Sequence, residues 1–325
     1  MLRVVGRRLL HAAVLVLAVS AACFVLAELV PGDFLAPARL DPRASAESLE
    51  ALRARYGLDR PLHQRYLSWL GSVLRGEMGH SLAYGVPVAP LVLGRAGNTL
   101  LLSVPATALA WLLALILGAW GARRPGGWGD RLSLGLGATL QAVPELVLAL
   151  LALLVAARSG IFPLGGMASL SAGELGFWGR LVDVLRHLAL PTLVLALALV
   201  PVLLRHVRAA LSEALEQSFV HAARGHGVGE LRLLLTYALP AAAPPLLALF
   251  GLSAGTLLSG SLVVEVVMSW PGLGPLLLDA VFARDLHVIV GATLLSGLLL
   301  VAGNLLADLL LYAVDPRLRR PGATP

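Results

Sequence analysis

Residues 97–122 read GNTLLLSVPATALAWLLALILGAWGA, a run that contains no charged side chain. A helix needs about 20 consecutive apolar residues to cross the hydrocarbon core of a bilayer, and this run is long enough. Its one proline, Pro105, is compatible with a membrane helix when neighbouring groups satisfy the freed backbone atoms. The run therefore predicts a transmembrane helix and assigns the chain to the membrane proteins.

Five further runs of this kind flank it: Leu9–Ala27, Leu132–Ala157 (broken only by Glu145), His187–Leu204, Leu233–Val264 and Leu286–Ala307. Of the 325 residues, 58% are hydrophobic and 14% charged, whereas soluble domains are about half apolar and a quarter charged. The first run is longer than the apolar core of a signal peptide, so we expect it to stay uncleaved. The sequence predicts an all-α polytopic membrane protein with six transmembrane helices.

The placement of the arginines predicts the orientation of these helices. With an inner N-terminus, the inner segments hold Arg3, Arg7, Arg8, Arg123, Arg124, Arg131, Arg205, Arg208, Arg224, Arg232, Arg317, Arg319 and Arg320. The short outer loops hold only Arg158, Arg180, Arg186 and Arg284. Cytoplasmic loops carry the excess of basic residues in membrane proteins. Both termini are therefore expected in the cytoplasm, and the net charge of +6 reflects orientation rather than nucleic-acid binding.

The composition also restricts the chemistry of the chain. There is no lysine, so a Walker A phosphate loop, which requires Gly-Lys-Ser/Thr, is excluded. The single cysteine, Cys23, lies in the first apolar run and cannot form an internal disulfide. No spacing of histidines and carboxylates indicates a metal site, and we expect no cofactor.

The long outer loop, residues 31–95, is expected to form a small cap. Ser45–Tyr56 and Pro61–Leu74 both have the spacing of short amphipathic helices. In the second, Tyr66 and Trp69 stand at i and i+3 and predict a packed face rather than a solvated loop.

The inner loop 205–240 is the most informative segment. Leu211–Gly225 can form one helix, which Gly225, Gly227 and Gly229 then end. Phe219, Ala222, Ala223 and His226 share a face of that helix, where a large anchor beside two alanines allows close approach of a partner. From the residues alone, a docking helix and an ordinary interfacial helix on the lipid are equally good interpretations.

This loop resembles the cytoplasmic signature of binding-protein-dependent ABC importer permeases. Ala222-Ala223, Gly227 and Leu239-Pro240 match the alanines, the glycine and the L-P pair of the signature, whereas His221 stands at its glutamate position. Further motifs resemble the peptide/nickel branch in order along the whole chain: Pro31-Gly32-Asp33, Tyr56-Gly57-Leu58-Asp59-Arg60-Pro61-Leu62, Gly76-Glu77-Met78-Gly79-His80-Ser81, Trp270-Pro271-Gly272-Leu273-Gly274 and Asp315-Pro316-Arg317.

The resemblance implies a type I ABC importer permease fold in a bacterial inner membrane. It implies an N-terminal arm and first helix at 1–30, an extracytoplasmic cap at 31–95, a five-helix permease core at 96–315 and a cytoplasmic tail at 316–325. Such a chain forms half of a translocation path, here for short peptides, with nickel, glutathione or sugars left open. Its implied partners are a second permease, favoured as a different chain, two ATP-binding subunits, an extracytoplasmic solute-binding protein and membrane lipid. The expected ATPase-coupling residues are Phe219, Val220, His221, Ala222, Ala223, Arg224, Gly225 and Gly227.

The few polar groups inside the spans are the candidates for the translocation path. They are Gln141, Glu145 and Asn304, and a fourth polar group, Asp308, is expected near the inner interface. Ionisable residues in a membrane are functional candidates, although contacts between helices remain an alternative for all four. A rival interpretation, a secondary transporter without an ATPase, would call for internal repeats that we do not find. An intramembrane enzyme is disfavoured because H-E-x-x-H and G-x-S-x-G are both missing from the sequence.

Overall fold

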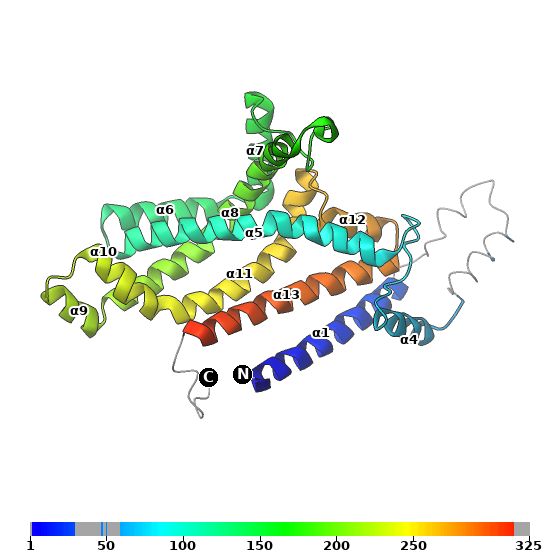
Figure 1. The fold of residues 1–325 in the computed structure, drawn as a ribbon, viewed down its shortest axis with the longest axis horizontal. Helices are drawn as coiled ribbons and strands as arrows, with labels where there is room; N and C mark the ends of the chain where they lie inside the picture. Colours follow the sequence, from blue (N-terminus) through cyan, green and yellow to red (C-terminus); the bar gives the residue numbers. More distant parts are fainter. Residues whose placement is uncertain (1, 30–46, 48–49, 51–58, 315–325) are drawn as a thin grey trace. The chain divides into compact units, whose positions relative to one another are not determined.

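The computed structural model describes residues 2–29, 47, 50 and 59–314, and within these the regular structure is helical (Figure 1). The principal helices are α1 (Leu2–Leu29), α4 (Leu62–Val73), α5 (Val88–Ala122), α6 (Trp128–Ala142), α7 (Glu145–Ser159), α8 (Phe177–Leu215), α9 (Ser218–Gly225), α11 (Leu239–Val267), α12 (Leu273–Phe282) and α13 (Leu286–Val314). Three short elements complete them: the 3₁₀ turn η1 (Ala172–Glu174), α10 (Glu230–Arg232) and the π-helix η2 (Leu233–Ala238). Of the predicted cap helices, Pro61–Leu74 is present as α4, whereas Ser45–Tyr56 lies outside the described residues apart from two positions.

The helical membrane fold predicted from the apolar runs is confirmed. Within the described ranges, 4 helices are long and apolar enough to cross a membrane, or up to 5 if a bent pair counts as one span. Among the described residues of α1, Ala13–Leu26 counts as a shorter apolar helix and is not included in these 4. The count of six spans therefore stays a prediction.

The predicted span Leu132–Ala157 is not one continuous helix. It is divided into α6 and α7, whose axes differ in direction by 95°. Pro144 is the cause, because a proline disfavours the α conformation in the residue before it. Val143 is accordingly extended, with φ −92° and ψ 117°, and α7 begins at Glu145 directly after the proline.

The chain forms two compact units, and the first comprises Met1–Thr99 and Pro271–Leu299. In it α4 packs against α1 through aromatic rings. The ring of Phe24 lies 5.3 Å from that of Tyr66 and 5.4 Å from that of Trp69, between centroids. Trp69 is buried and its indole nitrogen donates a hydrogen bond to the carbonyl of Met78. The packed face that Tyr66 and Trp69 predict is thus present.

A buried carboxylate connects the loop after α4 to the start of α13 in this first unit. Asp285 is 0% exposed and accepts hydrogen bonds from the Ser81 hydroxyl at 2.6 Å and from the backbone N–H of Ala83 at 3.0 Å. Hydrogen bonds to an ionised acceptor are stronger than neutral ones. The interaction joins residues 204 positions apart, so it anchors the loop that precedes α5.

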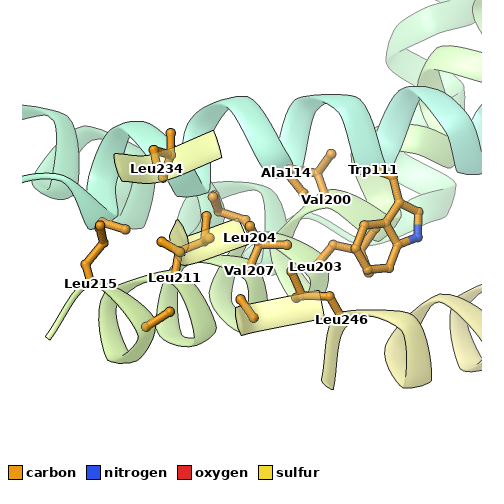
Figure 2. Close-up of a cluster of buried hydrophobic side chains, with 14 of the residues drawn as sticks. Trp111, Ala114, Val200, Leu203, Leu204, Val207, Leu211, Leu215, Leu234 and Leu246 are labelled. Atoms are coloured by element: carbon orange, nitrogen blue, oxygen red, sulfur yellow. The ribbon is translucent and has the colours of Figure 1, made fainter. Parts of the chain in front are cut away.

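The second unit comprises Leu100–Trp270 and Leu300–Pro325. Its core lies where α8 packs against α5, η2 and α11, and the side chains drawn in Figure 2 point into one cluster. This cluster, called the α8 cluster below, includes Trp111, Leu203, Val207, Leu211, Leu234 and Leu246. A Cβ at Gly118 would lie 2.8 Å from Val207 Cγ1, so the small residue permits the close approach of α5 to α8.

An ion pair fixes the turn between α5 and α6 to α8. The Arg208 guanidinium donates from Nε to Asp130 Oδ1 and from Nη2 to Asp130 Oδ2, the latter at 2.8 Å. Asp130 Oδ2 also accepts the backbone N–H of Gly126 at 2.7 Å. Both oxygens of the carboxylate are thereby bound within the unit.

Candidate functional site

The candidate site is the segment that follows α8, and there the predicted helix Leu211–Gly225 is interrupted. Helix α8 ends at Leu215, and Gln217 takes an extended conformation with ψ 144° before α9 begins at Ser218. The carbonyl of Gln217 accepts the N–H groups of Val220 and His221, which satisfies two of the free donors at the start of α9. The change of direction buries Val220 completely against the α8 cluster, and this burial is the physical reason for the break.

The end of α9 is a Schellman motif. Gly227 has φ +80°, its N–H donates to the carbonyl of Arg224 at 3.0 Å, and the N–H of Val228 donates to the carbonyl of Ala223 at 3.2 Å. This pair of bonds and the left-handed residue define the motif. Among the three predicted helix-ending glycines, Gly227 alone has a positive φ, so the turn depends on this one.

The short helix α9 has one inward and one outward face. Val220 is 0% exposed and Ala223 is partly buried against the α8 cluster. The Phe219 side chain is 46% exposed. The outward positions are Phe219, His221, Ala222, Arg224, Gly225 and His226. Phe219, Ala222 and His226 of the predicted common face are exposed, whereas Ala223, at the edge of that face nearest Val220, is partly buried.

The loop after α9 is closed by an exposed ion pair. Arg224 donates to Glu230 from Nε at 2.8 Å and from Nη2 at 3.2 Å, in the bidentate arrangement that gives directional recognition. An open groove of about 570 Å³ begins at the same glutamate and is lined by Gly229, Glu230, Leu231, Arg232, Leu235 and Thr236. Leu231 and Leu235 are 59% and 53% exposed, so the groove offers apolar surface beside α9.

A π-helix that the apolar run Leu233–Val264 does not reveal, η2 (Leu233–Ala238), lies between this groove and α11. The N–H of Leu239 donates to the carbonyl of Leu234, five residues earlier, as a π-helix requires. Pro240 follows at once and has no N–H to donate, which was the one local signal in the sequence. Single π turns within α-helices occur frequently at functional sites.

The three candidate path residues and Asp308 are placed as follows. Gln141 and Glu145 flank the break between α6 and α7, with Gln141 exposed and Glu145 half-buried. Glu145 Oε1 is buried and receives no hydrogen bond from the residues that the structure describes. Asn304 and Asp308 lie one turn apart on α13, and a Cβ at Gly251 would lie 3.5 Å from Asn304 Oδ1. In the described ranges, no hydrogen bond joins Asn304 to Gln141 or Glu145.

Comparison with known proteins agrees with this arrangement along the whole chain. Residues 110–320 match the family described as binding-protein-dependent transport system inner membrane component, and residues 1–96 match the N-terminal family of the same transport systems. The chain is 35% identical to the oligopeptide transport system permease AppB of Bacillus subtilis, over 96% of this chain and 98% of that one. It is 37% identical to a putative peptide permease of Brucella ovis (98% and 99% covered). It is 34% identical to the glutathione transport system permease GsiC of Salmonella paratyphi A (98% and 99% covered).

The fold also resembles a solved transporter. An inward-facing structure of the MetNI methionine ABC transporter aligns with a TM-score of 0.53 at 17% identity, covering 69% of this chain and 96% of that chain. At this identity the likeness concerns the fold alone. The family matches and the near full-length identities lead to one conclusion: the chain belongs to the binding-protein-dependent transport system inner membrane components, the permease subunits of ABC importers.

Proposed function

We propose that this chain forms half of the translocation path of an ATP-driven importer for short peptides and that α9 is its contact with an ATP-binding subunit. The observation that carries the proposal is the geometry of α9. Val220 anchors the helix inwardly, the Schellman motif fixes its end, and Phe219, Ala222 and His226 face outwards. A bulky side chain beside a small one suits insertion into a groove of a partner.

The partner subunits follow from this proposal and from the family. Two ATP-binding subunits would lie at α9 and its counterpart, an extracytoplasmic protein would deliver the substrate, and a second permease, favoured as a different chain, would complete the path. Closure of the ATP-binding pair would move α9 and bias the spans between two states. The topology that accompanies this arrangement has both termini and α9 in the cytoplasm.

The relatives of this chain favour peptides as its substrates. The relatives include oligopeptide, peptide and glutathione permeases, and all three names denote peptide-bonded molecules or their transport systems. A competition assay tests the substrate class: uptake of a labelled tripeptide by cells that carry the complete system should be inhibited by unlabelled di- and tripeptides. Inhibition by Ni²⁺ or sugars with none by peptides would refute the peptide assignment.

Within the path, we propose that the break between α6 and α7 faces the substrate. Transporter sites commonly lie where a span is interrupted, because irregular backbone in a membrane has to line a cavity or be buried in protein. Gln141 and Glu145 flank the interruption and would offer polar contacts there. Asn304 would make a secondary contribution from α13.

The contact on α9 is tested by Ala222→Arg. Ala222 is exposed, so a larger side chain at this position leaves the fold of the chain intact while holding a partner away from the helix. Overpacking a fitted interface costs about 1–3 kcal/mol, and a buried unpaired charge adds to this. We expect normal abundance in the membrane, with weaker copurification of the ATP-binding subunit or with ATP hydrolysis uncoupled from uptake.

Ala209→Arg is the matched control, because Ala209 is also exposed but lies on α8. It should retain copurification and uptake. If Ala222→Arg transports at the normal rate with the ATP-binding subunit still bound, α9 is not the coupling element. Ala223→Arg is less suitable for this test because Ala223 packs against the α8 cluster of its own chain.

A further inference from the structure

The outer face of α6 carries an apolar stripe that ends in a group of cations. Trp128, Leu132 and Leu136 stand at i, i+4 and i+8, with exposed fractions of 81%, 52% and 43%. Residues at this spacing share one side of a helix. At the Trp128 end of the stripe lie Arg123, Arg124 and Arg131, all of them exposed. We call these six residues the α6 outer surface.

The opposite side of α6 is already used within the second unit. Asp130, Ser133 and Gly137 are buried, and Asp130 is held by Arg208 and by the N–H of Gly126. A Cβ at Gly121 would lie 2.7 Å from Ser133 Oγ, so α5 approaches this side closely. These contacts fix the orientation of α6 about its own axis, so that the apolar stripe faces away from the second unit.

The three arginines have no partner within the described part of the chain. No hydrogen bond or ion pair joins Arg123, Arg124 or Arg131 to any described residue. Asp130, the acidic side chain among them in sequence, is committed to Arg208. Among the residues that the structure describes, these three cations within nine positions therefore have no neutralising group.

The aromatic groups at this end are characteristic of a membrane interface. Trp120 is 48% exposed, and a Cβ at Gly129 would lie 2.8 Å from its ring, so this indole covers the first turn of α6 beside Trp128. Tryptophan is enriched at the level of lipid headgroups because its ring is apolar and its N–H is polar. Basic residues at that level attract anionic headgroups.

We propose that the α6 outer surface binds an anionic phospholipid. The phosphate of the lipid would contact Arg123, Arg124 and Arg131, and one acyl chain would lie along Trp128, Leu132 and Leu136. Charge complementarity determines the headgroup, because three unpaired cations favour a net negative lipid over a zwitterionic one. The inference does not depend on the role of α9, and it holds whichever substrate the importer carries.

The test measures binding of defined lipids to the purified full chain in detergent by native mass spectrometry. Dioleoyl phosphatidylglycerol and dioleoyl phosphatidylcholine have the same acyl chains and differ in net charge. We expect phosphatidylglycerol to bind at least about 10-fold more tightly than phosphatidylcholine. Each arginine near an anionic headgroup increases the affinity about 5-fold. The R124Q/R131Q variant should lose most of this preference and keep its affinity for phosphatidylcholine.

R158Q/R186Q is the charge-matched control, because both of its arginines are exposed and lie on α7 and α8. It should preserve the preference for phosphatidylglycerol. W128A is an independent test. It should weaken the binding of both lipids by a similar factor, since the indole contacts the acyl chains rather than the charged headgroup. All variants change exposed side chains, and their thermal unfolding temperatures should equal that of the unmodified chain.

Four results would overturn the proposal. They are unchanged phosphatidylglycerol binding in R124Q/R131Q, an equal loss of preference in R158Q/R186Q, full displacement of the lipid by excess inorganic phosphate, and, when the complete transporter is purified instead, loss of a protein subunit in R124Q/R131Q with lipid binding intact. The third would identify a simple anion site, and the fourth a protein interface.

Discussion

Arg208 of α8 and Asp130 of α6 form a bidentate ion pair across 78 positions of sequence, and the Asp130 side chain is 5% exposed. Removing one partner of a buried pair leaves the other as an uncompensated charge, which costs about 3–5 kcal/mol. Because Arg208 is 24% exposed, the stability lost in Asp130→Ala should lie at or below the lower limit of this range. A clear decrease in the thermal unfolding temperature of the purified chain is the expected result.

The exposed pair Arg224–Glu230 supplies the control for this prediction. Its side chains are 39% and 55% exposed, and ion pairs at a surface contribute about 0–1 kcal/mol. Glu230→Gln should therefore leave the unfolding temperature nearly unchanged. An unfolding temperature of Asp130→Ala as little changed as that of Glu230→Gln would mean that the buried pair does not stabilise the α5–α6 turn.

Gly227→Val should disturb the end of α9. The left-handed conformation costs about 1–2 kcal/mol for a residue with a side chain, and Gly227 occupies it with φ +80°. We expect normal membrane abundance with reduced substrate uptake, measured in cells that carry the complete system. Gly225→Ala is the matched substitution, because Gly225 lies inside α9 and an added Cβ meets nothing within 4 Å. Reduced uptake in Gly225→Ala alone would contradict the argument from conformation.

Glu145→Gln should reduce transport by an order of magnitude without changing association with the ATP-binding subunit. The carboxylate stands at the break between α6 and α7, and an ionisable group inside a membrane segment is a functional candidate. Uptake of labelled tripeptide and copurification would be measured on the same membranes. Glu174→Gln, an exposed position in η1, should transport normally. Normal uptake in Glu145→Gln would exclude its side chain from the path.

Thiol labelling tests the orientation. In a Cys23→Ala background, which contains no other cysteine, Ser68→Cys should react with an impermeant maleimide added to intact cells. Ala209→Cys should react only after the membrane is opened. Both positions are exposed, so accessibility will report the side of the membrane rather than burial. The reverse pattern would contradict the arrangement with cytoplasmic termini.

The apolar runs predict most of the fold because length and hydropathy alone decide whether a helix can cross a bilayer. They do not reveal the break after Val143, since a proline in a membrane helix is compatible with either a continuous or an interrupted span. Pro191 and Pro201 illustrate this, because both lie inside the continuous helix α8. The difference depends on packing, which one sequence does not contain.

The candidate site could be located from sequence, but its faces could not. The family spacing of Ala222, Ala223 and Gly227 identifies the loop. The sequence does not predict the break between α8 and α9, because Glu216 and Gln217 are both compatible with a helix. The inward orientation of Val220 and the partial burial of Ala223 follow from that separation. Asp130 and Arg208 are too distant in sequence for any local pattern to pair them.

The π-helix at Leu233–Ala238 has a consequence for how the length of this chain can vary. A π turn contains one residue more than the α turn it replaces, and ordinary α-helical geometry is present on both sides of it. Deleting a residue elsewhere in a helix rotates everything beyond it by about 100°. Deleting one residue of η2 would convert the π turn into an ordinary α turn. The helical segments on both sides would then keep their relative rotation. The segment between α9 and α11 is thus a place where a homologue could be one residue shorter and still present α9 in the same orientation.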